Sequence, residues 1–466
     1  MTEISKKQYV LSSCQWDLPC MQCRKVGEFY LYTDEKLNVW QGQTASGDEV
    51  VLLGHAFCTD GEKMVVEDIR TFSGDDFVAL TSFWTGRWVL ISKTTLVTDA
   101  TGLMGAYYGQ KDGRWLVSSS PALVATLLGA ECKPTVKASG LSWHLLPSSV
   151  ADGVKKLFCS ETLKLSSDRL TPFFSNRFSD LRNLTTEEKC RRVADMLVNA
   201  AVNIHQYSGK RITLALTGGK DSRLVLSALC KAGVPFDACT AAHRAISRSD
   251  REMPPKLAAR FGINHRYLGA KPMDEERLAD YYRFCGGNHN GVDAFFYASG
   301  QFDELDEDVI LLRSGLFEAG QTYARGYTSS DPEGFQKGMT AYYADLQKSE
   351  TRDTLAFWLY TVRQNPIEHL DIRDRFYVEQ RVGGWVAAIE QSLDIHDFTS
   401  IQIANCAALL SVLLSCNEQE RGSLALSYQT ISLLEPAVLD FAVNKPSPSD
   451  RLRRLLSALK QRLRGK

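Results

Sequence analysis

The segment Leu214–Arg223 (LALTGGKDSR) carries the residues whose types and spacing most directly suggest chemistry. Residues 211–216 are β-prone, as in a buried parallel strand. Apolar residues recur at helical spacing after Ser222, so a helix is predicted to begin there. A glycine turn between a strand and a helix directs backbone N–H groups and the positive end of the helix dipole toward an anion. The sequence therefore predicts a phosphate-binding loop.

Asp221 within this loop indicates that the bound phosphate is bridged by a metal ion. Its carboxylate would repel a bare phosphate but could hold a Mg²⁺ ion that bridges phosphate oxygens. The spacing differs from that of a Walker A loop, whose glycines lie further apart and precede Lys-Ser/Thr. The alternative is a Gly-Gly turn that only supplies backbone freedom. The residues predicted to contact the nucleotide here are Leu216, Thr217, Gly218, Gly219, Lys220, Asp221 and Ser222.

Composition and charge exclude several classes of function. The 466 residues suggest about two to three domains, and a formal net charge of -1 does not favour a nucleic-acid partner. No apolar run reaches the ~18 residues of a membrane span, and residues 1–10 lack the apolar core of a signal peptide. The cysteines are scattered, and Cys20 and Cys23 have no second pair at zinc-site spacing. We expect a cytoplasmic protein with no membrane span and with reduced thiols.

Residues 1 to about 170 are predicted to be rich in β-strands, because short apolar runs alternate with Gly, Asp and Asn turns. The pattern breaks at residues 171–184. We place the boundary there, between a domain of residues 1–180 and a domain of residues 181–466. Thr185 and Glu188 then form a capping box before an amphipathic helix that leads to the loop.

Strands and helices alternate after the loop. Strands predicted at 236–241, 266–268 and 309–312 are separated by helical segments, which favours a right-handed, doubly wound parallel sheet. Ligands of such sheets bind beyond the carboxyl ends of the strands. From Thr340 onward the pattern is helical, including residues 403–414. The predicted fold is an α+β domain with a β-rich sandwich, followed by an α/β domain with a helical C-terminal part.

The loop resembles the SGGxDS pyrophosphate loop of the N-type ATP pyrophosphatases, the adenylating half of the asparagine synthetase family, with Thr217 in place of serine. The threonine hydroxyl can still donate to a phosphate oxygen. Residues 86–108 and 117–120 resemble the class II glutamine amidotransferase domain. That family uses an N-terminal cysteine nucleophile, whereas residue 2 here is Thr2, and Met104 replaces the family's arginine. The resemblance therefore implies a degenerate amidotransferase-like domain without glutaminase activity.

The resemblance also implies roles for residues beyond the loop. Adenine would lie near Thr240 and Ala241, at the end of the second strand. The segment 313–320 resembles the family's second Mg²⁺-binding segment with one residue missing, so Glu318 would be a metal ligand beside Asp221. The alternative is that Glu318 caps a helix.

Segments nearer the C-terminus resemble parts of the family's substrate site. Residues 376–382 resemble the E-x-R segment that lines the acyl-acceptor pocket, so Arg381 is expected to bind substrate, with Glu379 on the opposite side of the helix. β-Lactam synthetase pairs a tyrosine with a glutamate, which implies a Tyr323–Glu379 dyad that deprotonates the amine. Lys445 would neutralise developing phosphate charge, with basic residues of the tail as alternatives. The basic tail is predicted to be a solvated surface helix.

These features predict an ATP-dependent ligase that uses ATP and Mg²⁺ to adenylate a carboxylate, releases pyrophosphate and forms an amide bond. The substrates would be small-molecule or peptide carboxylates and amines, in the biosynthesis of a specialised metabolite, peptide or modified glycan. The amine would belong to the substrate itself, as in β-lactam synthetase or the lasso-peptide cyclases, or to a second molecule. Alternatives are free ammonia or a partner glutaminase as nitrogen source, and a non-catalytic nucleotide-binding regulatory or scaffold relative. A homodimer is left open.

Overall fold

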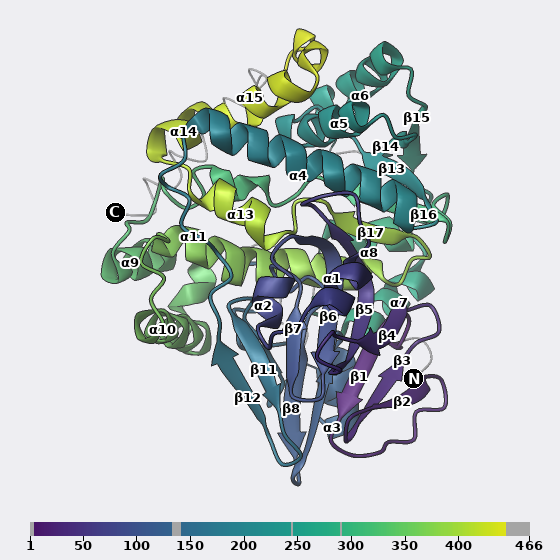
Figure 1. The fold of residues 1–466 in the computed structure, drawn as a ribbon, viewed down its shortest axis with the longest axis vertical. Coiled ribbons are helices and arrows are strands. Elements are labelled where there is room, and N and C mark those ends of the chain that lie inside the picture. Colours follow the sequence, from purple (N-terminus) through teal and green to yellow (C-terminus); the bar gives the residue numbers. More distant parts are fainter. Residues whose placement is uncertain (1–3, 133–140, 244–245, 289–290, 444–466) are drawn as a thin grey trace.

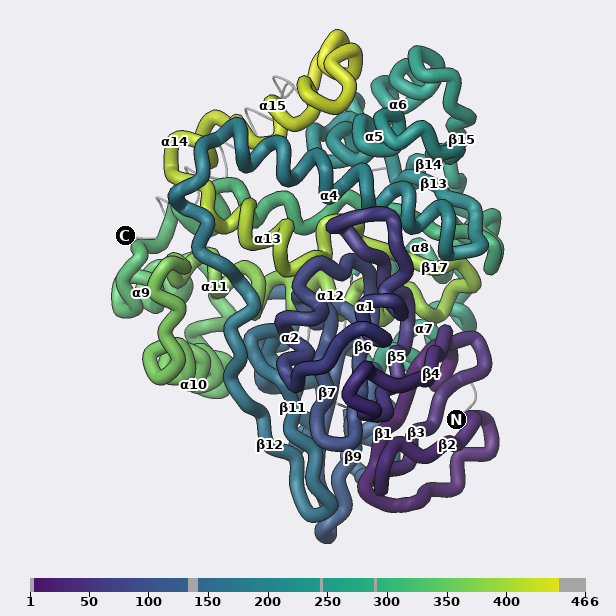
Figure 2. The backbone as a smooth tube through the Cα atoms, in the orientation of Figure 1, coloured from purple at the N-terminus to yellow at the C-terminus, as the bar shows by residue number. Residues whose placement is uncertain are grey.

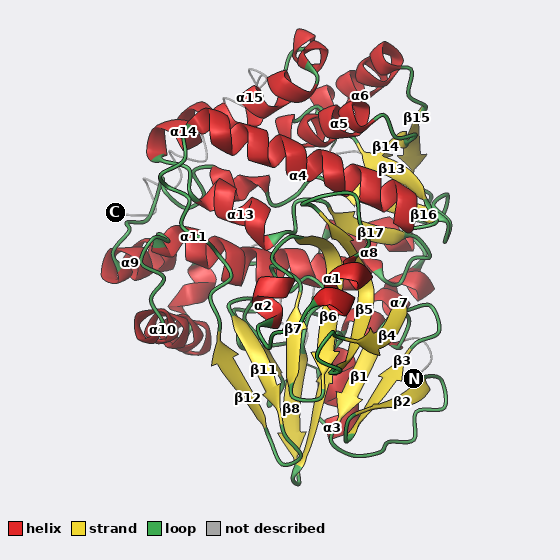
Figure 3. Ribbon diagram, in the orientation of Figure 1, coloured by secondary structure: helices red, strands yellow, loops and turns green. Residues whose placement is uncertain are grey.

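The computed structural model describes residues 4–132, 141–243, 246–288 and 291–443 (Figure 1). These residues form a β-rich N-terminal lobe and a C-terminal lobe built on a parallel sheet. The two kinds of secondary structure are segregated, with antiparallel strands gathered in the lower lobe and most helices in the upper one (Figure 3). The chain is therefore a mixed α/β fold with two domains, as the sequence predicted.

The N-terminal lobe is a sandwich of two six-stranded antiparallel sheets. In spatial order, the first sheet contains β10 (Lys155–Lys156), β8 (Tyr107–Lys111), β9 (Arg114–Ser118), β1 (Tyr9–Ser12), β3 (Phe29–Thr33) and β2 (Gln22–Val26). The second contains β12 (Leu170–Phe174), β11 (Glu161–Leu165), β7 (Thr95–Thr98), β6 (Trp84–Ser92), β5 (Glu49–Cys58) and β4 (Val39–Gln43). Leu11 and Leu31 from one sheet meet Leu53 and Val89 from the other in a buried core, because apolar side chains alternate along the strands.

Short helices cover the outer faces of this sandwich. The helices α1 (Val65–Thr71) and α2 (Phe77–Leu80) pack on the second sheet, and α3 (Pro121–Leu128) packs on the first. Each has an apolar side that the sheet buries. The lobe therefore has four layers.

The C-terminal lobe contains one parallel sheet of five strands. Its order is β15 (His265–Gly269), β14 (Asp237–Ala242), β13 (Arg211–Ala215), β16 (Val309–Arg313) and β17 (Thr399–Gln402). Neighbouring strands are parallel throughout. Successive strands extend the sheet first on one side of β13 and then on the other, so the strand order reverses between β13 and β16. The first four strands agree with the predicted ones, whereas β17 lies in a segment that was predicted to be helical.

Helices cover both faces of this sheet. One face packs against α4 (Thr186–Tyr207), α5 (Lys220–Ala232) and α13 (Ala407–Leu414), and the other against α12 (Ala387–Leu393). The remaining elements are α6 (Arg248–Phe261), α7 (Glu275–Cys285), α8 (Val292–Ala298), η2 (Phe317–Gly320), α9 (Pro332–Tyr342), η3 (Ala344–Gln347), α10 (Ser349–Gln364), α11 (Ile372–Phe376), the π-helix η4 (Tyr377–Val386), α14 (Glu418–Ser423), α15 (Ala425–Leu434) and η5 (Pro436–Asp440). None of the described helices combines the length and apolar composition that a bilayer span requires.

The helix α4 carries the chain from the N-terminal lobe to the parallel sheet (Figure 2). It begins at the predicted capping box, in which Glu188 N–H donates to Thr185 Oγ1 (3.3 Å) and Thr185 N–H donates to Glu188 Oε2 (2.8 Å). Its apolar side, including Val193 and Leu197, is buried in the core of the lobe. The prediction of an amphipathic helix here is confirmed.

Candidate active site

Hydrogen bonds to the hydroxyl groups of Thr217 and Ser222 hold the loop after β13 against the start of α5. Thr217 N–H donates to Ser222 Oγ (3.1 Å), and the two hydroxyl oxygens lie 2.9 Å apart. Gly219 N–H donates to Thr217 Oγ1 (3.2 Å). The predicted strand, glycine turn and helix are all present. Two N–H groups of the loop therefore donate to hydroxyl groups of the same loop.

Gly218 allows the loop to approach the start of α6 closely. A Cβ atom at Gly218 would overlap the side chain and backbone of Ser249, so a larger residue does not fit. Gly218 N–H donates to Asp250 Oδ1 (2.8 Å). One N–H group of the loop thus already donates to a carboxylate oxygen. This donor can therefore bind a negatively charged group.

The loop lies where the strand order of the parallel sheet reverses. It follows β13, and η2, which carries Glu318, follows the adjacent strand β16. In doubly wound sheets this switch point, outside the carboxyl ends of the strands, is where ligands bind. The topology therefore brings Asp221 and Glu318, nearly a hundred residues apart in sequence, to the same edge of the sheet.

The two predicted metal ligands, Asp221 and Glu318, lie close enough for their charges to interact. Asp221 Oδ1 lies 3.0 Å from Lys220 Nζ but accepts no hydrogen bond of acceptable geometry from the described residues. Desolvation by the surrounding protein, reinforced by the charge of Asp221, raises the pKa of Glu318, while Arg381 and Lys220 oppose the rise. The oxygens of these two carboxylates are of the kind that Mg²⁺ prefers as ligands. The residues present therefore fit a magnesium ion held by Asp221 and Glu318.

Arg381 reaches this site from the π-helix η4. Its guanidinium lies over two indole rings, 3.7 Å from the ring centroid of Trp385 and 5.2 Å from that of Trp143. Within the described part of the chain no carboxylate forms an ion pair with it. A guanidinium that is held in place by stacking and has unused donors is suited to bind a carboxylate. Runs of π-helix are rare and often occur at functional sites.

The predicted Tyr323–Glu379 dyad does not form. Glu379 is 2% exposed and accepts hydrogen bonds from Ser160 Oγ (2.5 Å), Trp358 Nε1 (2.7 Å) and Arg375 Nε (2.9 Å). Tyr323 instead packs against the ring of Tyr377, with a centroid distance of 5.1 Å. The carboxylate of Glu379 is thus engaged by three donors, none of which is Tyr323. Glu379 is therefore buried in packing contacts, whereas the charge of Arg381 acts on Glu318 at the site.

The residues proposed to lie near adenine form the end of β14. Thr240 is buried, and its hydroxyl donates to Leu216 O (2.7 Å) and lies 2.9 Å from His265 Nε2. Leu216 is also buried, and Ala241 is half-buried. Because the Thr240 side chain is used within the sheet, adenine recognition here would depend on backbone groups.

Lys445 lies outside the described residues, but the chain just before it is anchored beside the loop. Arg223, buried in the first turns of α5, donates to Phe441 O (2.7 Å), Ala442 O (2.7 Å) and Gly218 O (3.2 Å). The predicted role of Lys445 stays a prediction. Sequence reasoning missed Arg223, although a charged residue on the apolar side of a predicted helix was the available signal.

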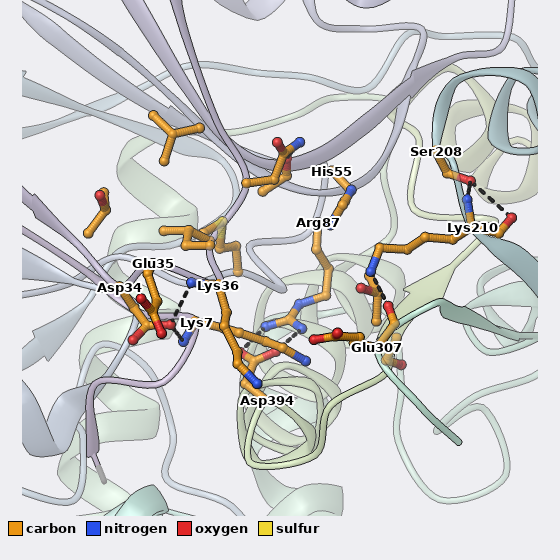
Figure 4. A pocket seen from close by; sticks show the side chains of 18 of the residues that line it. Lys7, Asp34, Glu35, Lys36, His55, Arg87, Ser208, Lys210, Glu307 and Asp394 are labelled. Atoms are coloured by element: carbon orange, nitrogen blue, oxygen red, sulfur yellow. Dashed lines mark hydrogen bonds and ion pairs between the residues drawn. The ribbon is translucent and has the colours of Figure 1, made fainter. Parts of the chain in front are cut away.

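A cavity of about 740 Å³ lies between the lobes, at the other end of the parallel sheet (Figure 4). Its lining includes Lys210 and Asp308, which immediately precede β13 and β16. Arg87 donates two hydrogen bonds of 2.8 and 2.9 Å to Asp394 in its wall. Because ligands of such sheets bind at the carboxyl ends of the strands, we do not assign the nucleotide to this cavity.

A buried histidine beside this cavity should make the protein sensitive to acid. His396 is 6% exposed and packs edge-on against Tyr297 and Phe302. Burial, together with the charges of Lys7 and Lys6, lowers the pKa of His396 to about 3. The unfolded chain takes up this proton near pH 6.5, so between those values it binds more protons than the folded chain. Stability that is present above pH 6.5 is therefore lost as the pH falls toward 3.

The wild-type protein is expected to lose stability between pH 7 and pH 4.5. We expect this loss to be about 2 kcal/mol smaller in His396→Phe. Urea unfolding at both pH values measures the difference. The control is His205→Asn, because His205 is exposed on α4. Equal pH dependence in the wild-type protein and His396→Phe would contradict the assignment.

Comparison with protein-family models and with curated proteins finds no match. Among solved structures, the chain overlaps NMN synthetase from Francisella tularensis over 32% of its own length and 60% of that chain, with 19% identity and a TM-score of 0.22. It overlaps the allosteric regulatory enzyme of purine biosynthesis over 62% and 74% of the two chains (8% identity, TM-score 0.26). It overlaps glutamine PRPP amidotransferase from B. subtilis, complexed with ADP and GMP, over 72% and 74% (9% identity, TM-score 0.23). At these TM-scores the likeness is coarse, so function must be inferred from the side chains of the site.

Proposed function

We propose that this chain is an ATP-dependent ligase that activates a substrate carboxylate as an acyl-adenylate and joins it to an amine. The observation that carries the proposal is the convergence of four features at the switch point of the sheet: the loop after β13, Asp221, Glu318 and Arg381. A phosphate-binding loop, a pair of acids and a guanidinium without an acidic partner are what this reaction requires in one place.

The loop side of the site would bind the triphosphate. Mg²⁺ held by Asp221 and Glu318 would neutralise the charge of the leaving pyrophosphate. The N–H groups at the start of α5 and the hydroxyls of Thr217 and Ser222 would bind phosphate oxygens. Lys220, which now pairs with Asp221, would add a positive charge near the same oxygens.

The Arg381 side would bind the acid. An oxygen of the substrate carboxylate attacks the α-phosphorus, and the bond to the bridging oxygen of pyrophosphate breaks. The amine then attacks the acyl carbon, loses a proton, and AMP leaves. Arginine suits the first step because its planar donors hold a carboxylate in a defined orientation. Tyr323 and Lys445 remain candidates for proton transfer and charge neutralisation.

We propose that the amine does not come from glutamine hydrolysis in the N-terminal lobe. Met104, where the resemblance expects an arginine, is buried next to Gly54. An apolar thioether cannot hold a glutamine carboxylate as an arginine does. The amine would then belong to the substrate, to a second molecule, or to ammonia supplied from elsewhere.

The test is to incubate the full chain with Mg–ATP and a panel of carboxylic acids, with and without amines, and to quantify AMP and pyrophosphate. We expect the two products in equal amounts, and only when a suitable acid is present. Parallel reactions with ammonium salts and with a glutaminase separate the nitrogen sources. Formation of ADP and phosphate would overturn the adenylation chemistry. Nucleotide binding without pyrophosphate release from any acid would instead favour a non-catalytic binding protein.

A further inference from the structure

The π-helix η4 that carries Arg381 is unusually long. It extends over residues Tyr377–Val386, whereas π-helical turns in proteins are mostly single. Its hydrogen bonds run from each N–H to the fifth preceding carbonyl, as in Ala387 N–H to Val382 O. Such a helix needs contacts from outside to be stable in place of an α-helix.

Those contacts come from a short stretch of the N-terminal lobe. Its members, which we call the interdomain clamp, are Trp143, Leu146, Lys156, Cys159 and Ser160. They lie on the loop before β10, on β10 itself and just after it. They meet six residues of η4: Val378, Glu379, Gln380, Arg381, Gly383 and Gly384.

Three of these contacts are buried polar bonds to backbone groups, including the one from Cys159 Sγ to Val378 O (3.8 Å). Lys156, 3% exposed, donates from Nζ to Gly383 O (2.5 Å). The Gln380 amide bonds the backbone of Leu146 in both directions, accepting from Leu146 N–H (2.8 Å) and donating to Leu146 O (2.9 Å). Ser160 Oγ donates to Glu379 (2.5 Å). Buried bonds of this kind are costly to break, because each leaves an unsatisfied polar group.

Trp143 connects the clamp directly to Arg381. One face of its indole lies under the Arg381 guanidinium, 5.2 Å from the ring centroid. The same ring packs on Gly384, where an added Cβ would overlap the indole. Trp143 itself is buried. The indole is therefore held against the helix backbone and offers a fixed surface to the guanidinium.

We infer that the N-terminal lobe is a positioning element of the synthetase site: its interdomain clamp holds η4 in the π-helical form and thereby fixes Arg381 opposite the loop. This inference rests on the proposed function for the role of Arg381. This positioning role does not require glutaminase activity in the N-terminal lobe. Lys156 and Trp143 are positioning residues, since they act through η4.

The first test is hydrogen exchange of the full chain, which needs no substrate. Lys156→Met removes the donor, and Gly384→Ala displaces Trp143. In each we expect amides of residues 377–386 to exchange at least about tenfold faster, while those of α4 are unchanged. The matched controls are Lys155→Met, because Lys155 is the exposed neighbour of Lys156, and Gly422→Ala in α14, where an added Cβ has open space. Unchanged exchange in η4 would overturn the inference.

The second test uses an acid that supports pyrophosphate release. We expect Lys156→Met and Gly384→Ala to raise the KM for the acid about tenfold, with the KM for ATP and kcat little changed. Lys156→Gln, which keeps a donor, should recover part of the loss. Faster exchange with an unchanged KM would overturn the positioning role and leave the proposed function intact. If no acid supports release in the wild-type chain, the proposed function fails, and the exchange data alone decide whether the clamp holds η4.

Discussion

Replacing Asp221 with asparagine should lower Mg–ATP-dependent pyrophosphate release by at least about a hundredfold. Asparagine keeps the size of the side chain but removes the negative charge that a magnesium ion requires. Asp221 lies in the loop at the switch point, where its Oδ1 forms an ion pair with Lys220 (3.0 Å) but accepts no hydrogen bond of good geometry from the described residues. Its loss would leave Glu318 alone to hold the ion. Release of pyrophosphate with a suitable acid measures the effect.

The effect should depend on the metal. Added Mg²⁺ should restore part of the activity of Asp221→Asn, because a weakened site can be filled by mass action. The control is Asp195→Asn, since Asp195 is an exposed residue of α4. If Asp221→Asn were fully active at low Mg²⁺, Asp221 would not be a metal ligand. The proposed adenylation chemistry would then lose its main support.

Replacing Asp374 with alanine should lower the free energy of unfolding by about 3–5 kcal/mol. Asp374 is 4% exposed and accepts two hydrogen bonds of 2.9 Å from Arg325 and one of 2.9 Å from Arg421. Removing the carboxylate leaves the buried Arg421 guanidinium without its counter-charge and leaves Arg325 with only the exposed carboxylate of Glu418 (2.9 Å). Arg421 also donates to Ala319 O (2.8 Å), within η2, and to Gln321 O (3.0 Å), just after it. The turn that carries Glu318 should therefore loosen as well.

Denaturant unfolding followed by tryptophan fluorescence measures this loss. The control is Glu187→Ala, which removes an exposed ion pair with Arg191 on α4 and should cost under about 1 kcal/mol. A loss below about 1 kcal/mol in Asp374→Ala would show that the buried network does not hold this region together.

Much of the C-terminal lobe could be predicted from the sequence, because its signals are local. The strand, glycine turn and helix around Gly218 are adjacent in the chain, and so are Thr185 and Glu188 of the capping box. The alternation of strands and helices then implies a parallel sheet with its ligand site at the carboxyl ends. These features required no knowledge of distant contacts.

The features that were missed depend on distant contacts. The strand β17 is short, and it is a strand because it pairs with β16, which lies far earlier in the chain. The π-helix changes the direction in which each side chain points, so a pattern read at α-helical spacing could not show that Glu379 faces Ser160. Trp143 comes from the other lobe and has no sequence signal that relates it to Arg381.

The sequence by itself determined the loop at Thr217–Ser222, the acid within it and the type of sheet that presents it, since these follow from neighbouring residues and from the period of apolar positions. The family resemblance named Glu318 and Arg381 as distant members of the site, but only the tertiary structure decided how they come to the loop. Glu318 comes to it because β16 lies beside β13, and Arg381 faces it because the N-terminal lobe holds η4. The cause is the same in both cases: side chains far apart in sequence meet only where packing of the whole chain brings their backbones together.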